Sequence, residues 1–177
     1  MPRIGIRNAR EIADMEDRIQ VLKGKRVLVV DDEPDILGSL EDLLDMCEMD
    51  RAERYEEAVE LLETRPYDAA ILDIMGVRGY ELLDVAEKKG IPTLMLTAHA
   101  LSSDHFVKSI RSGAHAYVPK DRISDIATFL SDVLGEAGAP GKRRRWFERL
   151  EAFFEETFGP GWRDKEDPDF WKKNFYI

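Results

Sequence analysis

A regular alternation of strand-like and helix-like segments fills the middle of the chain and most constrains its fold. Short apolar runs alternate with longer stretches whose apolar residues recur at three- and four-residue steps. We predict strands at 26–31, 50–54, 68–73, 92–97 and 116–118. We predict helices at 34–47, 55–63, 79–89, 104–112 and 124–134. Such alternation is typical of an α/β fold, in which helices cover both faces of a parallel sheet.

The composition of the strands predicts their order in the sheet. The runs at 26–31, 68–73 and 92–97 are the most continuously apolar, so we expect them at the centre. The polar run at 50–54 and the short run at 116–118 suit edges. Right-handed crossovers then give a doubly wound five-stranded sheet of order 2-1-3-4-5. In such sheets a ligand binds at the carboxyl ends of the strands, between strands one and three.

The two strands beside that point both end in carboxylates. The first runs into Asp31-Asp32 and the third ends at Asp73. Alone, Asp73 could simply cap a turn, but the coincidence of the two strands favours a functional site. Because like charges raise one another's pKa, three carboxylates at one edge call for a cation. Mg²⁺ suits such a site, since it binds carboxylate oxygens and accepts phosphate oxygens as further ligands.

Two further polar residues end the remaining strands of this edge. Thr97 closes the fourth strand with a hydroxyl, and Lys120 follows the fifth with a mobile positive charge. Individually, Thr97 fits an ordinary strand residue and Lys120 a solvated loop charge. Together with the carboxylates and a divalent metal, they make up a phosphoryl-transfer site.

Residues 25–135 resemble the receiver domain of two-component response regulators, the CheY-like family. The resemblance covers about two-thirds of the chain and rests on spaced positions, each at the end of its strand: Asp31, Asp32, Asp73, Thr97, Tyr117 and Lys120. It implies that Asp73 accepts a phosphoryl group from a phosphohistidine on a sensor histidine kinase or phosphotransfer protein. It also implies a phosphoacceptor rather than an enzyme, with at most slow self-phosphorylation from small donors and auto-dephosphorylation.

The resemblance implies a magnesium site and a role for Lys120. The metal would be held by Asp31, Asp32, Asp73 and the backbone carbonyl of Met75. Asp32 would be the direct ligand of the acidic pair, with Asp31 acting partly through water. Lys120 would pair with the phosphoryl oxygens.

The resemblance also implies a conformational switch. The Thr97 hydroxyl would move to the phosphoryl group, and Tyr117 would turn inward into the space that Thr97 leaves. This movement would alter the face formed by the helix 104–112, the strand 116–118 and the helix 124–134, as a population shift biased by the new charge.

The loop after Asp73 departs from the family pattern. Val77 stands where receivers usually have Pro, and Gly79 follows Asp73 by six residues instead of eight. The loop is therefore about two residues shorter, and Gly76 and Gly79 would allow a tighter path. A second departure is Asp121, which follows Lys120 where many receivers have Pro.

The ends of the chain add helices outside the receiver region. We predict four parts: an N-terminal amphipathic helix in 1–24, the receiver domain in 25–135, a linker in 136–145 and an aromatic-rich helical extension in 146–177. The stripe of the first helix must pack on the main domain or on another chain; its members are Ile12, Met15, Ile19 and Leu22. The extension holds all three tryptophans and six of the eight phenylalanines.

Aromatic residues dominate interface energetics, so we expect the extension to make a protein contact. It would fold back on the receiver, pair with the N-terminal helix or build a homodimer. Only about 37 residues follow Pro140, and no recognisable output domain is among them.

Charge and composition limit the partners. The formal net charge is -10, and residues 25–139 carry 12 Lys/Arg against 24 Asp/Glu, so this region repels nucleic acid. The basic run at 143–145 is short and fits a solvated helix start. Cys47 is the single cysteine and fits a reducing compartment. No apolar run approaches the roughly 18 residues of a membrane span, and no signal peptide is evident, so we expect a cytoplasmic protein.

The sequence therefore favours a response regulator of a two-component phosphorelay, in which phosphoryl acceptance on Asp73 switches a surface that binds a downstream protein. The alternative is a degenerate receiver that acts as a phosphorylation-independent scaffold or dimerisation module. A phosphatase with an aspartyl-phosphate intermediate is set aside, because that class expects a second Asp where Met75 stands.

Overall fold

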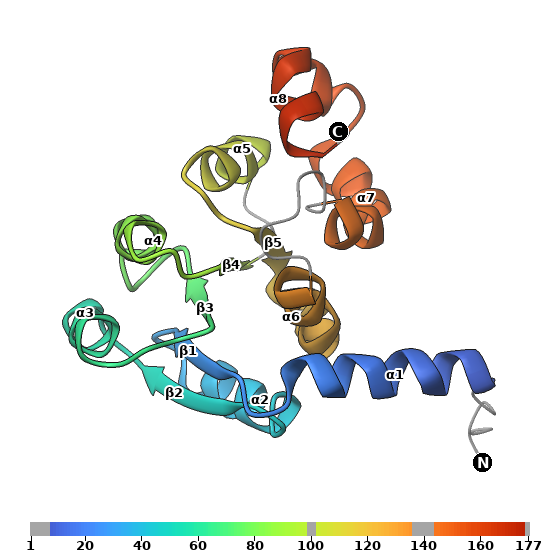
Figure 1. Cartoon of the computed structure of the whole chain (residues 1–177). Helices are drawn as coiled ribbons and strands as arrows, with labels where there is room; N and C mark the ends of the chain where they lie inside the picture. Colours follow the sequence, from blue (N-terminus) through green and yellow to red (C-terminus); the bar gives the residue numbers. More distant parts are fainter. Residues whose placement is uncertain (1–7, 99–101, 136–143, 176–177) are drawn as a thin grey trace.

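The computed structural model describes residues 8–98, 102–135 and 144–175 and has a five-stranded parallel sheet at its centre (Figure 1). The strands are β1 Arg26–Val30, β2 Glu48–Ala52, β3 Ala69–Asp73, β4 Thr93–Thr97 and β5 Ala116–Pro119. Their order is β2-β1-β3-β4-β5, so the predicted doubly wound fold and strand order are confirmed.

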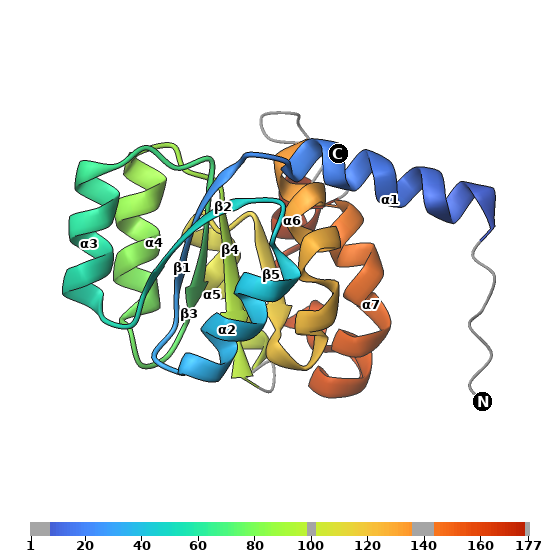
Figure 2. The same cartoon turned by 90° about the horizontal axis from the view of Figure 1, so that it is seen from below.

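Helices cover both faces of the sheet (Figure 2). On one face lie α2 Pro34–Leu43 and α6 Ile126–Gly135, and on the other lie α3 Tyr55–Thr64, α4 Gly79–Lys88 and α5 Ser103–Arg111. Residues 27–30 of β1 and all of β3 are consequently buried. This double cover explains why the two strands are continuously apolar up to their terminal carboxylates.

The register of the sheet brings the ends of β1, β3 and β4 to one edge. Val30 pairs with Leu72, and Asp73 pairs with Leu96. All pairs are parallel, so the residues that follow these strands enter loops on the same side of the domain.

The boundaries of β2 and of its preceding helix differ from the prediction. We predicted a strand at 50–54, but β2 begins at Glu48, whose amide donates to the Lys25 carbonyl at 2.8 Å. The helix predicted to reach residue 47 ends at Leu43. As an edge strand, β2 tolerates polar side chains, and apolar periodicity therefore places its start poorly. The helix predicted to begin at residue 124 begins two residues later, at Ile126. The 3-10 helix η2 Lys120–Asp125 precedes it.

The N-terminal helix α1, Ala9–Leu22, packs on α6 through its C-terminal half and extends past the domain body (Figure 2). Leu22 is fully buried, and the Arg18 guanidinium donates to the Thr128 hydroxyl of α6 at 2.9 Å. Ile12 and Ile19 remain 47% and 41% exposed. The apolar stripe is therefore only partly covered by the main domain.

The chain after residue 143 folds back onto the sheet and its flanking helices as α7 Arg144–Phe158, the 3-10 helix η3 Trp162–Lys165 and α8 Pro168–Asn174 (Figure 1). We call these three helices the C-terminal module. Helix α7 begins two residues earlier than predicted, within the expected linker, and η3 was not predicted. The rest of that linker, 136–143, lies outside the described residues.

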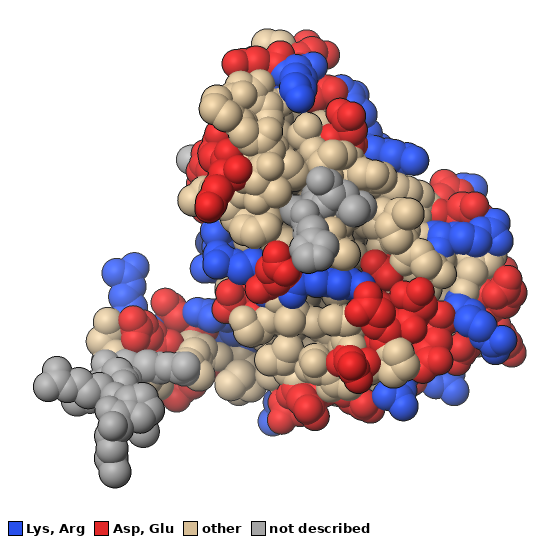
Figure 3. Space-filling view, turned by 180° about the vertical axis from the view of Figure 1, so that it is seen from behind, with Lys and Arg blue, Asp and Glu red and all other residues tan. Residues whose placement is uncertain are grey.

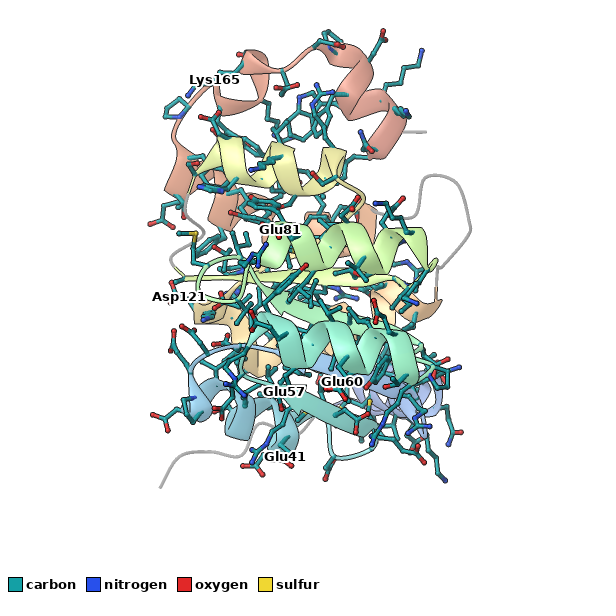
Figure 4. The ribbon with its side chains drawn as sticks, turned by 90° about the vertical axis from the view of Figure 1, so that its left-hand side faces the viewer. Glu41, Glu57, Glu60, Glu81, Asp121 and Lys165 are labelled. Atoms are coloured by element: carbon teal, nitrogen blue, oxygen red, sulfur yellow. The ribbon has the colours of Figure 1, made fainter. Side chains whose placement is uncertain are left out.

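The surface carries the charge asymmetry of the composition. Figure 3 shows acidic side chains gathered in a broad area on the side of the molecule away from α1, with basic side chains interspersed. Figure 4 shows Glu41 on α2 and Glu57 and Glu60 on α3 along the outer surface. Of the helices that the structure describes, none combines the length and apolar character needed to cross a membrane.

Phe106 of α5 joins the α/β domain to the C-terminal module, and its replacement tests that packing. The side chain is fully buried, and its ring centroid lies 5.1 Å from that of Phe154 and 5.4 Å from that of Trp162. We expect Phe106→Ala to lower the free energy of unfolding by about 3–5 kcal/mol, measured by urea denaturation. Val107→Ala, at the half-buried next position, is the control and should cost about 1 kcal/mol or less. Equal losses in both variants would contradict the packing.

Candidate functional site

The predicted carboxylates meet at the carboxyl edge of the sheet. Asp31 directly follows β1 and is 1% exposed, and Asp73 is the last residue of β3 and is 4% exposed. Asp32 is exposed at the rim. Because β1 and β3 are neighbours in the sheet, the two buried carboxylates lie close enough for the charge of Asp31 to raise the pKa of Asp73.

Lys120 reaches into this cluster from the end of β5. Its ammonium lies 2.9 Å from Asp31 Oδ2, 3.5 Å from Asp73 Oδ1 and 3.1 Å from Glu33 Oε1. The Lys120 side chain is only 10% exposed. One positive charge therefore faces several carboxylates in a largely desolvated setting, where ion pairs are screened little by solvent.

Glu33 is a member of the cluster that the sequence interpretation missed. Its carboxylate accepts a hydrogen bond from Lys120, and its backbone amide donates to Asp31 Oδ1 at 2.9 Å. Its only sequence signal was its position directly after Asp31-Asp32. The region is rich in acidic residues, so that signal was not distinctive.

Burial and mutual repulsion shift the protonation of the buried carboxyls. Burial, with the charges of Asp31 and Asp32, raises the pKa of Asp73 to about 7 against the opposing effect of Lys120. Burial also raises the pKa of Asp31, although its hydrogen bond with Lys120 acts in the opposite direction. Burial tends to lower the pKa of Lys120, but the hydrogen bond and charge of Asp31 and the charge of Asp73 together raise it.

This cluster has the donor set of a hard divalent cation. Carboxylate oxygens of Asp31, Asp32 and Glu33 lie within 4.8 Å of one another, and all are oxygen donors. Burial and the charges of Asp31 and Asp32 raise the pKa of Asp73 despite Lys120, so the cluster favours further positive charge. Mg²⁺ prefers oxygen ligands and one or two carboxylates, so the residues present fit that ion.

The shortened loop after Asp73 is held tightly against the acidic pair. Gly76 has φ of 88°, and a β-carbon there would lie 2.5 Å from Asp32 Oδ2. A β-carbon at Gly79 would lie 2.1 Å from the Asp73 carbonyl oxygen. Arg78 is left-handed, with φ of 56°. These features give the short loop its path, and the Met75 side chain points outward, 61% exposed.

Thr97 and Tyr117 form a buried polar pair beside the site. Thr97 ends β4, Tyr117 lies on β5, and both are fully buried. Burial raises the pKa of Tyr117, and the hydrogen bond with the Thr97 hydroxyl acts against that rise. The Tyr117 ring packs edge-on against Phe106, with centroids 5.4 Å apart. The predicted inward movement of Tyr117 stays a prediction.

The second departure from the family pattern has a simple geometry. No peptide bond of the described residues is cis, so Lys120 and Asp121 are joined in the ordinary trans form. Asp121 lies at the same end of the sheet as the acidic cluster and is exposed (Figure 4).

Comparison with known families agrees with this geometry. Residues 27–130 match the response regulator receiver domain, and the chain belongs to that family. A solved CheY-like receiver domain protein from Methanospirillum hungatei JF-1 is 30% identical, with a TM-score of 0.59, covering 65% of this chain and 97% of that one. A putative response regulator from Chloroflexus aurantiacus J-10-fl is 28% identical, with a TM-score of 0.58 and coverage of 64% and 99%.

Curated relatives are longer proteins named as response regulators. The two-component response regulator ARR18 of Arabidopsis thaliana is 35% identical over 103 residues, which are 55% of this chain and 16% of that protein. The heme response regulator HssR of Staphylococcus aureus (strain Newman) is 37% identical over 98 residues, 52% of this chain and 43% of that protein. The match thus spans less than half the length of these relatives.

The raised pKa of Asp73 predicts a pH-dependent stability in the absence of divalent metal. The folded protein binds this proton more tightly than the unfolded chain, whose value is near 3.8. Asp73 therefore contributes stability at pH below about 4 that is lost as the pH rises through about 7. We expect Asp73→Asn to raise the free energy of unfolding by a few kcal/mol at pH 8 in chelator, and by much less at pH 5.

Asp121→Asn removes one exposed charge at the same edge and serves as the control. We expect it to change stability by less than about 0.5 kcal/mol at both pH values. A gain from Asp73→Asn that is equal at pH 5 and pH 8 would contradict the shifted pKa.

Proposed function

We propose that the chain is a response regulator in which Asp73 accepts a phosphoryl group from a phosphohistidine of a sensor histidine kinase or phosphotransfer protein. The observation that carries this proposal is the position of Asp73: a buried carboxylate at the end of β3, with Asp31 and Asp32 beside it and the Lys120 ammonium 3.5 Å away. Membership of the receiver family supports the same reaction class.

The transfer step requires the ionised form of Asp73. An Asp73 carboxylate oxygen attacks phosphorus, the new O–P bond forms as the N–P bond of the donor breaks, and the electron pair leaves with the imidazole nitrogen. Asp31, Asp32, Asp73 and the Met75 carbonyl would hold Mg²⁺, which supplies positive charge to the carboxylates and the phosphoryl oxygens when bound.

The remaining residues would stabilise the phosphorylated product. Lys120 would exchange part of its contact with Asp31 and Glu33 for the phosphoryl oxygens, a charge-assisted interaction. The Thr97 hydroxyl would donate to the phosphoryl group, and Tyr117, its present partner, would adjust in response. This shift would change the surface formed by α5, β5 and α6, which would bind a downstream protein.

The proposed domain organisation follows from these roles. The receiver domain would occupy 25–135, preceded by the amphipathic helix in 1–24 and followed by the linker in 136–145 and the helical extension in 146–177. The terminal helices would serve protein contact, including a homodimer, and neither nucleic acid nor a membrane would be a partner. The acidic surface away from α1 supports the exclusion of nucleic acid. We propose a cytoplasmic location.

Phosphoryl acceptance is tested with a small phosphodonor. We expect the protein to gain the mass of one phosphoryl group on incubation with acetyl phosphate and Mg²⁺, measured by intact mass spectrometry. The gain should vanish in chelator and in Asp73→Asn, and Asp121→Asn should react like the wild type. Equal labelling of the wild type and Asp73→Asn would sink the proposal and favour the phosphorylation-independent scaffold.

The tight loop predicts a specific effect of a methyl group at Gly76. We expect Gly76→Ala to displace the Asp32 carboxylate and weaken Mg²⁺ affinity by about 10–100-fold, measured by isothermal titration calorimetry. Gly90→Ala is the matched control, because Gly90 also has positive φ (69°) but its β-carbon would meet no atom within 4 Å. It should lose about 1 kcal/mol of stability and keep the wild-type Mg²⁺ affinity. Loss of affinity in both variants would contradict the local explanation.

A further inference from the structure

The C-terminal module covers the surface formed by α5, β5 and α6, which we call the switch face (Figure 1). Phe106 of α5 is at the centre of this contact and packs against rings from each of the module's three helices. Its centroid lies 5.1 Å from Phe154 of α7, 5.4 Å from Trp162 of η3 and 6.2 Å from Trp171 of α8. The aromatic residues that made the extension conspicuous in the sequence are thus used within the chain.

Ion pairs hold the module on both sides of β5. On α6, Asp132 accepts two hydrogen bonds from Arg149 of α7, at 2.7 Å from Nε and 3.2 Å from Nη2. On α5, Arg111 pairs with Glu166, and its guanidinium lies 4.9 Å from the centre of the Phe170 ring. Asp132 is buried, so removal of Arg149 would leave a desolvated charge. The module is therefore attached to both helices that flank β5.

One side chain connects this contact to the phosphoryl site. Tyr117 hydrogen-bonds with Thr97 at its hydroxyl end, and its ring packs against Phe106 of the receiver and Phe154 of the module, with centroids 5.4 and 6.1 Å apart. A movement of Tyr117 therefore changes the packing of Phe154 directly. No intervening loop or helix shift is needed to carry it.

We propose that the C-terminal module is an intramolecular ligand of the switch face, and that its docking and the phosphorylation of Asp73 oppose each other through Thr97, Tyr117 and Phe154. This inference rests on the proposed function of Asp73. A second copy of the chain, or any partner that binds the switch face, must first displace the module.

The opposition follows from the close packing around Thr97. Its hydroxyl donates to the Ala98 carbonyl at 3.4 Å, and turning it to a phosphoryl oxygen moves the side chain away from the fully buried Tyr117. A close-packed interior does not keep the resulting space empty, so the Tyr117 ring moves into it. That movement removes packing from Phe154, which loosens the module. By linkage, a docked module must lower the affinity of the site for a phosphoryl group by the same factor.

The chain contains its own reporter for this coupling. All three tryptophans belong to the module: Trp146, Trp162 and Trp171 are 1%, 2% and 8% exposed. Release of the module would transfer these indoles to water and shift their emission to longer wavelength. Amide exchange in α7 and α8 gives an independent measure of docking.

The test uses the full chain with Mg²⁺ and beryllofluoride as the phosphoryl mimic. Binding at Asp73 is followed by fluorine NMR, and docking by tryptophan emission and amide exchange in α7 and α8. We expect binding to be accompanied by a red shift and faster exchange, with neither change in Asp73→Asn. Binding without either change would overturn the coupling and leave the proposed function intact. Absence of Mg²⁺-dependent binding would overturn both.

The reciprocal effect, in which a loosened module strengthens binding of the mimic at Asp73, is tested by substitutions in the module. We expect Phe154→Ala to bind beryllofluoride about 5-fold or more tightly than the wild type. Phe153→Ala is the matched control, because among the described residues the Phe153 ring packs on Phe154 but not on Tyr117. It should bind within about 2-fold of the wild type, below the smallest typical coupling.

A second variant loosens the module without changing its aromatic packing. Arg149→Ala removes the ion pair to α6 without removing an aromatic ring, and it should tighten beryllofluoride binding in the same direction. Protected amides in β1 and β3 show that the receiver sheet remains folded. Unchanged affinity in both Phe154→Ala and Arg149→Ala would overturn the proposal.

Discussion

The contact of the Lys120 ammonium with Asp31 and Asp73 is the interaction on which the site depends. Asp31 and Asp73 are buried at the ends of the adjacent strands β1 and β3. The parallel pairing of these strands holds the two carboxylates close together. Lys120 supplies a single positive charge at 2.9 and 3.5 Å, but burial and the charges of Asp31 and Asp32 outweigh it, and the pKa of Asp73 is raised. This buried acidic cluster suits a divalent cation and a phosphoryl group.

The fold and the members of the site could be read from the sequence where one physical rule decided each position. Burial on both faces makes the central strands apolar, and handed crossovers fix their order, so Asp31, Asp73 and Thr97 could be placed at one edge. The features that the sequence did not predict depend on contacts between segments that are far apart in the chain. An edge strand tolerates polar residues, which hid the start at Glu48, and Glu33 differed in no visible way from its acidic neighbours. The aromatic stripe required a partner surface, but Phe106 offered no periodic signal as that partner.

The switch face of the receiver connects the phosphoryl site with the C-terminal module. Tyr117 lies between them, with its hydroxyl end on Thr97 and its ring on Phe154. Because all these groups are buried in a close-packed interior, one side chain cannot shift without repacking of the next. Binding chemistry at the sheet edge is thereby connected to the outer helices through two residues. Helix α1 stands apart from this path, on the far side of α6, where its exposed Ile12 and Ile19 leave an apolar surface.

The most direct test of the central claim is a crystal structure of the full chain with Mg²⁺ and beryllofluoride. The account requires the mimic on an Asp73 carboxylate oxygen, the Lys120 ammonium and the Thr97 hydroxyl within hydrogen-bond distance of its fluorines, and Tyr117 displaced from Phe154. Clear density for Mg²⁺ but none for the mimic at Asp73, with Lys120 still on Asp31 and Tyr117 unmoved, would contradict it.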